Sequence, residues 1–231
     1  MTAESTESNS LHHDLAHFYR DRFDRGSSLF DIWEEGGADG DSITPATYHP
    51  GYRYWMGELL TGALGKRGGG LLSLGCGNGA VEADIARAGF PVLAVDAMPE
   101  AVELTRRKGV PAVCADLFRW EPDAPWTVLY LDGLLGHLHS PEHGLRPVFD
   151  RVRGWCASGG ATLIASNDSP RDGGDVQAAP GVDGFRWLSA EYMRRQALES
   201  GFDAVSTAQF RYQRPLSGER VRAVVTCHVT P

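Results

Sequence analysis

The residues most suggestive of chemistry are a run of glycines and an acid that follows it. Gly75, Gly77 and Gly79 come directly after the apolar segment 71–74, and Asp96 ends a second apolar segment. Glycines at the end of a buried strand let the backbone turn sharply and approach a ligand closely. An acid about 20 residues after such a turn is typical of a carboxylate that binds the hydroxyl groups of a ribose. The pattern predicts one half of a nucleoside-binding site.

Two histidines suited to proton transfer follow the apolar segment 127–131, which we predict to be another strand. They are His137 and His139. A neutral imidazole accepts a proton close to neutral pH, so we expect one of the two to act as a general base. The alternative for either residue is a helix cap or a position on the surface.

Side chains with oxygen atoms stand at the ends of two predicted strands. Asp132 directly follows the segment 127–131, and Asn167 and Asp168 follow the apolar segment 161–165. Hard oxygen ligands of this kind suit magnesium. We favour the other interpretation, in which Asn167 and Asp168 are loop residues close to a substrate and no metal is bound.

The elements that must position these residues alternate between strand and helix patterns. This alternation predicts a parallel sheet with helices on both faces, closed by a hairpin formed by 204–212 and 221–229. Strands are predicted at 71–74, 91–95, 112–115, 127–131 and 161–165, and helices at 80–88, 99–108, 141–156 and 189–200. The polar stretch 167–184 is predicted to be a long loop.

Three regions are expected along the chain. Residues 1–10 are polar and predict a disordered tail. Residues 11–66 predict a small helical lid, with helices at 11–23 and 52–64 and a loop at 31–47. Residues 67–231 contain the glycine turn and predict the cofactor-binding core.

The ordered set of motifs resembles the class I S-adenosylmethionine-dependent methyltransferases. The segment LSLGCGNG at 72–79 is similar to their glycine motif, Asp96 matches their ribose-binding acid, and 114–118 resembles their adenine-binding segment. The resemblance covers residues 70–229. It implies an α/β, Rossmann-like seven-stranded sheet with helices on both faces and the last strand antiparallel.

The resemblance also implies S-adenosylmethionine as the cofactor and a set of residues around it. The expected cofactor contacts are Gly75, Cys76, Gly77, Asn78, Gly79, Asp96, Ala97, Met98, Asp116, Leu117, Phe118, Asp132 and Gly133. An aromatic and polar stretch before the core, together with residues after the fifth strand, is expected to contact the substrate. These residues are Tyr48, His49, Tyr52, Arg53, Asn167, Asp168 and Arg186.

The function implied by the resemblance is methyl transfer to an oxygen or nitrogen of a small-molecule metabolite. The transfer is an in-line displacement, and the Ala, Gly and Arg bias suggests a bacterial source and antibiotic biosynthesis. One alternative is an NAD-dependent oxidoreductase, which the terminal hairpin disfavours because a dinucleotide domain continues with parallel strands. The other alternative is a nucleoside-binding module without catalysis.

Composition limits the partners of the chain. Its 231 residues carry a formal net charge of −8, which argues against broad binding to nucleic acid phosphates. No apolar stretch is long enough to span a bilayer, and the first residues lack the features of a signal peptide. We therefore expect a cytoplasmic protein without a membrane or nucleic acid partner. The oligomeric state is left open.

Overall fold

The structure of the chain is a computed structural model that describes Tyr19 and residues 28–231. The predicted tail 1–10 lies outside the described residues, as does the predicted helix 11–23 apart from Tyr19. Among the described residues, no helix is both long and apolar enough to cross a membrane.

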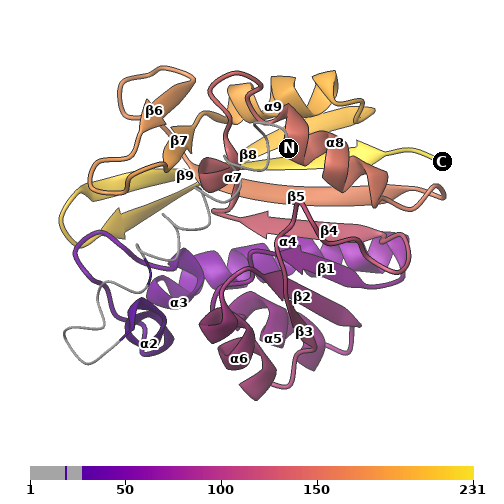
Figure 1. Cartoon of the computed structure of the whole chain (residues 1–231), viewed down its shortest axis with the longest axis horizontal. Helices are drawn as coiled ribbons and strands as arrows, with labels where there is room; N and C mark the ends of the chain where they lie inside the picture. The colour runs from indigo at the N-terminus through magenta and orange to yellow at the C-terminus, as the bar shows by residue number, and fades with distance from the viewer. Residues whose placement is uncertain (1–18, 20–27) are drawn as a thin grey trace, which may run out of the picture.

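A seven-stranded sheet forms the centre of the molecule, with the spatial order β3-β2-β1-β4-β5-β9-β8 (Figure 1). Strands β1 to β5 are parallel, and β9 lies antiparallel between β5 and β8. The strands are β1 Leu71–Leu74, β2 Val92–Asp96, β3 Ala112–Cys114, β4 Val128–Asp132, β5 Ala161–Asp168, β8 Ala204–Arg214 and β9 Gly218–Val229. The predicted sheet with an antiparallel last strand and a terminal hairpin is confirmed.

Helices cover both faces of this sheet, as predicted. Helices α4, α5 and α6 pack on one face, and α8 and α9 pack on the other (Figure 1). The helices are α2 Leu29–Glu34, α3 Pro45–Tyr48, α4 Pro50–Arg67, α5 Ala80–Arg87, α6 Pro99–Arg107, α7 Leu135–Leu138, α8 Arg146–Gly154 and α9 Ala190–Glu199.

The two faces of the sheet explain why its central strands are apolar throughout. Successive side chains of a strand point to opposite faces. Leu71 and Val128 join the core beneath α4 and α5, whereas Leu72 and Leu129 join the core beneath α8 and α9. Because both faces are covered, neither set of positions can be polar without cost.

Helix α4, predicted above as the second helix of the lid, is packed directly on the sheet. Its residues Tyr52, Met56, Leu60 and Leu64 recur every four positions and are each 0% exposed. This spacing places all four on one face of the helix. Helix α4 is therefore a layer of the core and not part of a cover.

Three other predicted segments need correction. The predicted loop 31–47 includes most of α2 and part of α3. The helix predicted from Pro141 begins at Arg146, because Ser140 and Gly144 bond to each other in a turn. The predicted loop 167–184 begins inside β5, which continues to Asp168 because β9 pairs with it over its whole length.

The same stretch also contains part of a second, two-stranded antiparallel sheet, formed by β6 Val176–Ala178 and β7 Arg186–Leu188. This small sheet lies with α2, α3 and α7 at one end of the molecule (Figure 1). It is the end at which β4 and β5 finish, and ligands of open parallel sheets bind beyond the carboxyl ends of the strands. The fold therefore gathers the covering elements where a ligand is expected.

The packing of α4 can be tested with Leu60→Ala. The change removes a buried side chain from the core, so we expect the free energy of unfolding to fall by about 2–5 kcal/mol. Urea denaturation measures the change. Glu58→Ala, at an exposed position of the same helix, is the control and should stay within about 0.5 kcal/mol of the parent. A loss at Leu60 no larger than the control would show that α4 is a loosely attached cover.

Candidate active site

The glycine turn follows β1 and bends through three left-handed residues. Gly75, Gly77 and Gly79 have φ angles of 70°, 54° and 67°. At Gly77 a Cβ atom would meet no protein atom within 4 Å, so its surroundings are open. At Gly79 a Cβ atom would lie 2.5 Å from the Thr105 hydroxyl, so this glycine permits α5 to pack closely on α6. Gly75 and Gly77 line the cavity described below, and Gly79 does not.

Asp96 lies at the end of β2, directly beside this turn. Its Oδ2 accepts from the Gly77 N–H at 2.9 Å, and its Oδ1 accepts from the Met98 N–H at 2.9 Å. Burial raises the pKa of Asp96 to about 6. The carboxylate is thus oriented by the two backbone segments that form the cofactor end of the site.

One cavity of about 1650 Å³ opens at the carboxyl ends of the strands. Ligand pockets usually measure roughly 300–1,000 Å³, so this cavity has room for two ligands side by side. Of the predicted cofactor contacts, all except Gly79 line it; they are Gly75, Cys76, Gly77, Asn78, Asp96, Ala97, Met98, Asp116, Leu117, Phe118, Asp132 and Gly133. These predicted residues thus share one wall, and their contact with a cofactor stays a prediction.

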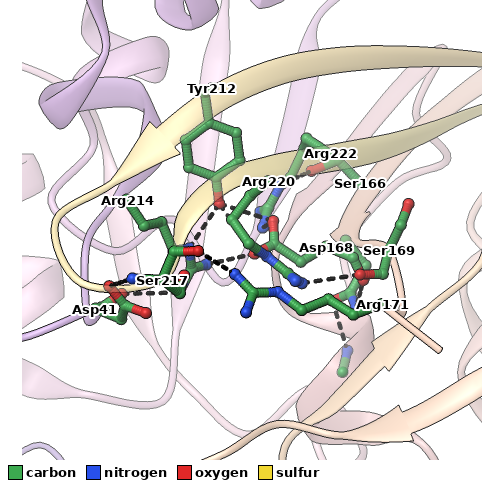
Figure 2. Close-up of polar contacts among 12 residues, drawn as sticks. Asp41, Ser166, Asp168, Ser169, Arg171, Tyr212, Arg214, Ser217, Arg220 and Arg222 are labelled. Carbon is green, nitrogen blue, oxygen red and sulfur yellow. Dashed lines mark hydrogen bonds and ion pairs between the residues drawn. The ribbon is translucent and has the colours of Figure 1, made fainter.

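A buried network of charges lies where β4, β5 and β9 meet, and its members Asp132, Arg214 and Arg222 line the cavity. Figure 2 shows the part of the network around Asp168. Arg222 pairs with Asp132 and also lies 3.1 Å from Asp168 Oδ1. Arg214 binds Asp168 Oδ2 at 2.6 Å, and the Tyr212 hydroxyl donates to Asp168 Oδ1 at 2.8 Å. Burial acts to raise the pKa of Asp168, but the charges of Arg214, Arg222 and Arg220 outweigh it and lower that pKa.

The proposed magnesium ligands are therefore engaged by protein groups. Asp132 also accepts from the hydroxyls of Tyr52 and Tyr130, at 2.9 and 3.1 Å. Its oxygens and those of Asp168 face arginine and hydroxyl donors. These donors neutralise the charge that would attract a cation, which supports the metal-free interpretation. No group of metal-ligating side chains was found among Tyr19 and residues 28–231.

Four residues of the aromatic stretch do not line the cavity, which corrects their prediction as substrate contacts. Tyr48 ends α3, and the His49 ring accepts from the Tyr52 N–H at the start of α4. Tyr52 points into the core, where its hydroxyl supports Asp132. Arg53 pairs with Asp84 of α5. Helix α4 thus directs Tyr52 toward the sheet and Arg53 toward α5.

Asn167 and Asp168 also need correction, because they are strand residues with 0% exposure and do not line the cavity. The Asn167 side chain donates to the Arg186 carbonyl at 2.9 Å and accepts from the Gly136 N–H at 3.2 Å. It therefore joins β7 to α7. Of the predicted substrate contacts, Arg186 lines the cavity.

Both predicted histidines line the cavity, and both are kept neutral. His137 packs against the Phe185 ring at 4.5 Å, and burial lowers its pKa to about 4. His139 Nε2 lies 3.0 Å from the Tyr192 hydroxyl. Burial and the nearby charge of Arg186 lower the pKa of His139. Either ring is thus a neutral group at pH 7, and His137 is the weaker base.

Several residues of the wall were missed by the sequence analysis. Tyr19, Phe30 and Trp33 form an aromatic cluster with ring centroids 5.1–5.8 Å apart, and all three line the cavity. They belong to segments that precede the core and carry no motif. A helical spacing of aromatic residues at 30 and 33 was the available signal.

Glu82 of α5 was also missed, although it is a charged residue with only 3% exposure. It lines the cavity, and its Oε1 accepts from the Ser73 hydroxyl at 2.5 Å. Burial raises its pKa to about 7. Above pH 7 the folded protein therefore holds a buried negative charge beside the glycine turn.

The raised pKa of Glu82 predicts a pH-dependent effect of Glu82→Gln on stability. An unfolded Glu titrates near 4.3, so above pH 7 the buried charge opposes folding, and this cost disappears as the pH falls toward 4.5. Glu82→Gln should raise the free energy of unfolding by about 3–4 kcal/mol at pH 8 and by about 1 kcal/mol at pH 5. Urea denaturation at both pH values, with the exposed Glu103→Gln as control, measures the effect. A pH-independent difference would contradict the assignment.

The family model of a methyltransferase domain matches residues 50–207. A tabtoxin biosynthesis enzyme of Pseudomonas amygdali pv. tabaci is 46% identical over 204 residues, which are 87% of this chain and 81% of that protein.

Solved structures of methyltransferases share the fold. The 1,6-didemethyltoxoflavin-N1-methyltransferase of Burkholderia thailandensis, with 1,6-didemethyltoxoflavin and S-adenosylhomocysteine bound, matches with a TM-score of 0.70 at 20% identity. That match covers 100% of this chain and 92% of the other. The magnesium protoporphyrin IX methyltransferase of Synechocystis PCC 6803, with S-adenosylmethionine bound, matches with a TM-score of 0.59 at 15% identity and covers 90% and 93%. The family match, the sheet order and the glycine turn with Asp96 together show that the chain belongs to the class I S-adenosylmethionine-dependent methyltransferases.

Proposed function

We propose that the chain transfers the methyl group of S-adenosylmethionine to an oxygen or nitrogen atom of a small-molecule metabolite. The observation that carries this proposal is that one continuous cavity is lined by the glycine turn, Asp96 and both histidines. Its volume of about 1650 Å³ is enough for cofactor and acceptor together. The tabtoxin biosynthesis relative supports a role in specialised metabolism.

The cofactor lies at the glycine end of the cavity in this proposal. Asp96 exchanges part of its backbone hydrogen bonding for the ribose hydroxyls, and Asp116 with Phe118 holds the adenine. Asn78 is 1% exposed, and its side chain donates to Glu34 Oε2 at 3.1 Å. This contact ties the turn to α2.

Tyr19 and the described residues 28–49, which precede α4, serve as a cover of the site. Tyr19, Phe30 and Trp33 bring aromatic faces to the cavity wall close to Asp96. Aromatic faces attract cations, so they suit the positively charged sulfonium of the cofactor. The lid proposed here is shorter than residues 11–66, because α4 belongs to the core.

The chemical step requires alignment more than strong acid–base catalysis. A lone pair of the acceptor attacks the methyl carbon, the carbon–sulfur bond breaks toward sulfur, and S-adenosylhomocysteine leaves. A neutral His139 takes the proton of the acceptor where it carries one. His139 is favoured over His137 because burial lowers the pKa of His137 to about 4, which makes His137 a weak base.

The cofactor assignment predicts that calorimetry detects S-adenosylhomocysteine binding and no NAD binding. Asp96→Ala should weaken the binding at least tenfold, because hydrogen bonds to a charged group contribute roughly 1.5–3 kcal/mol each. Binding by the parent should weaken as the pH falls through about 6, where Asp96 gains a proton. Asp150→Ala, an exposed carboxylate on α8, should bind normally. Tight NAD binding alone would contradict the proposal.

The base assignment predicts that His139→Gln lowers turnover by roughly 100-fold while the affinity for S-adenosylhomocysteine stays unchanged. Because the pKa of His139 lies below its ordinary value of 6.5, the parent rate should be level above that pH and fall only below it. The assay uses labelled cofactor and a panel of candidate acceptors.

The control for this variant is His228→Gln, whose ring contacts Thr162 at 3.2 Å and lies outside the cavity wall. Activity should also survive EDTA. If His139→Gln is fully active, the acceptor reacts without a base. If EDTA abolishes activity, the metal-free interpretation is wrong.

A further inference from the structure

Arg186 is a half-buried cation without a partner among the described residues. It begins β7 and lines the cavity. Every other arginine of the described residues has a hydrogen bond or an ion pair with a protein group. Withdrawing a charge from water is unfavourable unless a counter-charge compensates. Arg186 is therefore suited to a ligand that brings a negative charge.

The position of Arg186 is fixed by buried contacts. Asn167, which is 0% exposed, donates to its carbonyl at 2.9 Å and accepts from the Gly136 N–H at 3.2 Å. This double contact holds β7 against α7. Arg186 and His139 both line the cavity, and the charge of Arg186 contributes to the lowered pKa of His139.

Arg171 is a second cation of the cavity wall that forms no ion pair with a carboxylate of the described residues. Arg171, an exposed residue, donates to the carbonyl of Ser217, a neutral group (Figure 2). Its guanidinium lies 5.9 Å from the Trp187 ring. The Arg220 guanidinium stacks on the same ring at 3.7 Å. Trp187 follows Arg186 in β7, so this stacking further restrains the strand that carries Arg186.

The two buried carboxylates of the network are already neutralised. Asp168 is bound by Arg214 and Arg222, and Asp132 is bound by Arg222. Asp41 and Glu142 also line the cavity, and neither forms an ion pair with Arg171 or Arg186.

We propose that the acceptor carries an anionic oxygen group, a carboxylate or a phosphate, which binds to Arg186 with Arg171 as the second cation. This inference rests on the proposed methyl transfer and names the substrate class of that site. A planar guanidinium fork matches the oxygens of either group. The anion anchors the acceptor against β7, and its nucleophilic atom lies toward His139 and the cofactor.

The test is calorimetric titration of the full chain with glutarate, with inorganic phosphate and with the neutral analogue glutaramide. Each titration is made with and without saturating S-adenosylhomocysteine. We expect glutarate, phosphate or both to bind saturably, and glutaramide not to bind. Arg186→Gln should weaken the binding of the anion by roughly 10- to 100-fold, and Arg171→Gln should weaken it by less. Arg107→Gln, on the distant α6 and paired with Glu103, should have no effect.

The outcomes separate the two proposals. Binding of glutarate alone identifies a carboxylate, and binding of phosphate alone identifies a phosphate ester. Absence of saturable anion binding, or equal binding by the parent and Arg186→Gln, overturns the inference. S-adenosylhomocysteine should bind equally to all variants. If it does not bind to the parent, the proposed methyl transfer fails, and the titrations without it still decide the anion site.

Discussion

The arrangement at the carboxyl ends of β4 and β5 depends on the ion pairs that the buried Arg222 guanidinium forms there. Parallel strands β4 and β5 end in Asp132 and Asp168, which brings two carboxylates to the same edge. Arg222 reaches both and also donates to the Ser166 hydroxyl at 3.1 Å. A lone buried charge is strongly unfavourable, so these acids require a cation from the neighbouring strand.

That requirement explains why the antiparallel strand matters for the site. In the ladder between β5 and β9, Arg222 stands opposite Asp168. A slip of one residue would turn Arg222 to the other face, which would leave Asp132 without its ion pair and remove one of the cations that bind Asp168. The ion pairs thus specify the register of the last strand, which in turn holds the tip of the β8–β9 hairpin and Arg214 at the cavity.

Much of the fold followed from local patterns. The apolar runs at 71–74 and 161–165 mark strands because both faces of the sheet are covered, and glycine at 75, 77 and 79 marks the turn because those residues adopt positive φ. Errors occurred where pairing partners distant in the chain decide the conformation. Residues 166–168 look like the start of a loop by composition, yet they continue β5 because β9 offers a full ladder. The strands β6 and β7 are three residues each, too short for a local pattern.

The amino-acid sequence by itself predicted the cavity wall that contains the glycine turn, Asp96 and Asp116, because these residues lie in short segments whose geometry is set by neighbouring residues. The acceptor side was decided by the tertiary structure alone. Substrate contacts are often polar residues of the kind found at Tyr52, Asn167 and Asp168. Here Tyr52 is buried because it lies on the face of α4 that packs on the sheet, and Asn167 and Asp168 are buried because β5 continues through them. Arg171 and Arg186 join the wall only when β7 pairs with β6 and is held by Asn167. Whether a charged side chain meets solvent, a counter-ion or a ligand depends on residues far away in the chain, and that information is absent from local sequence.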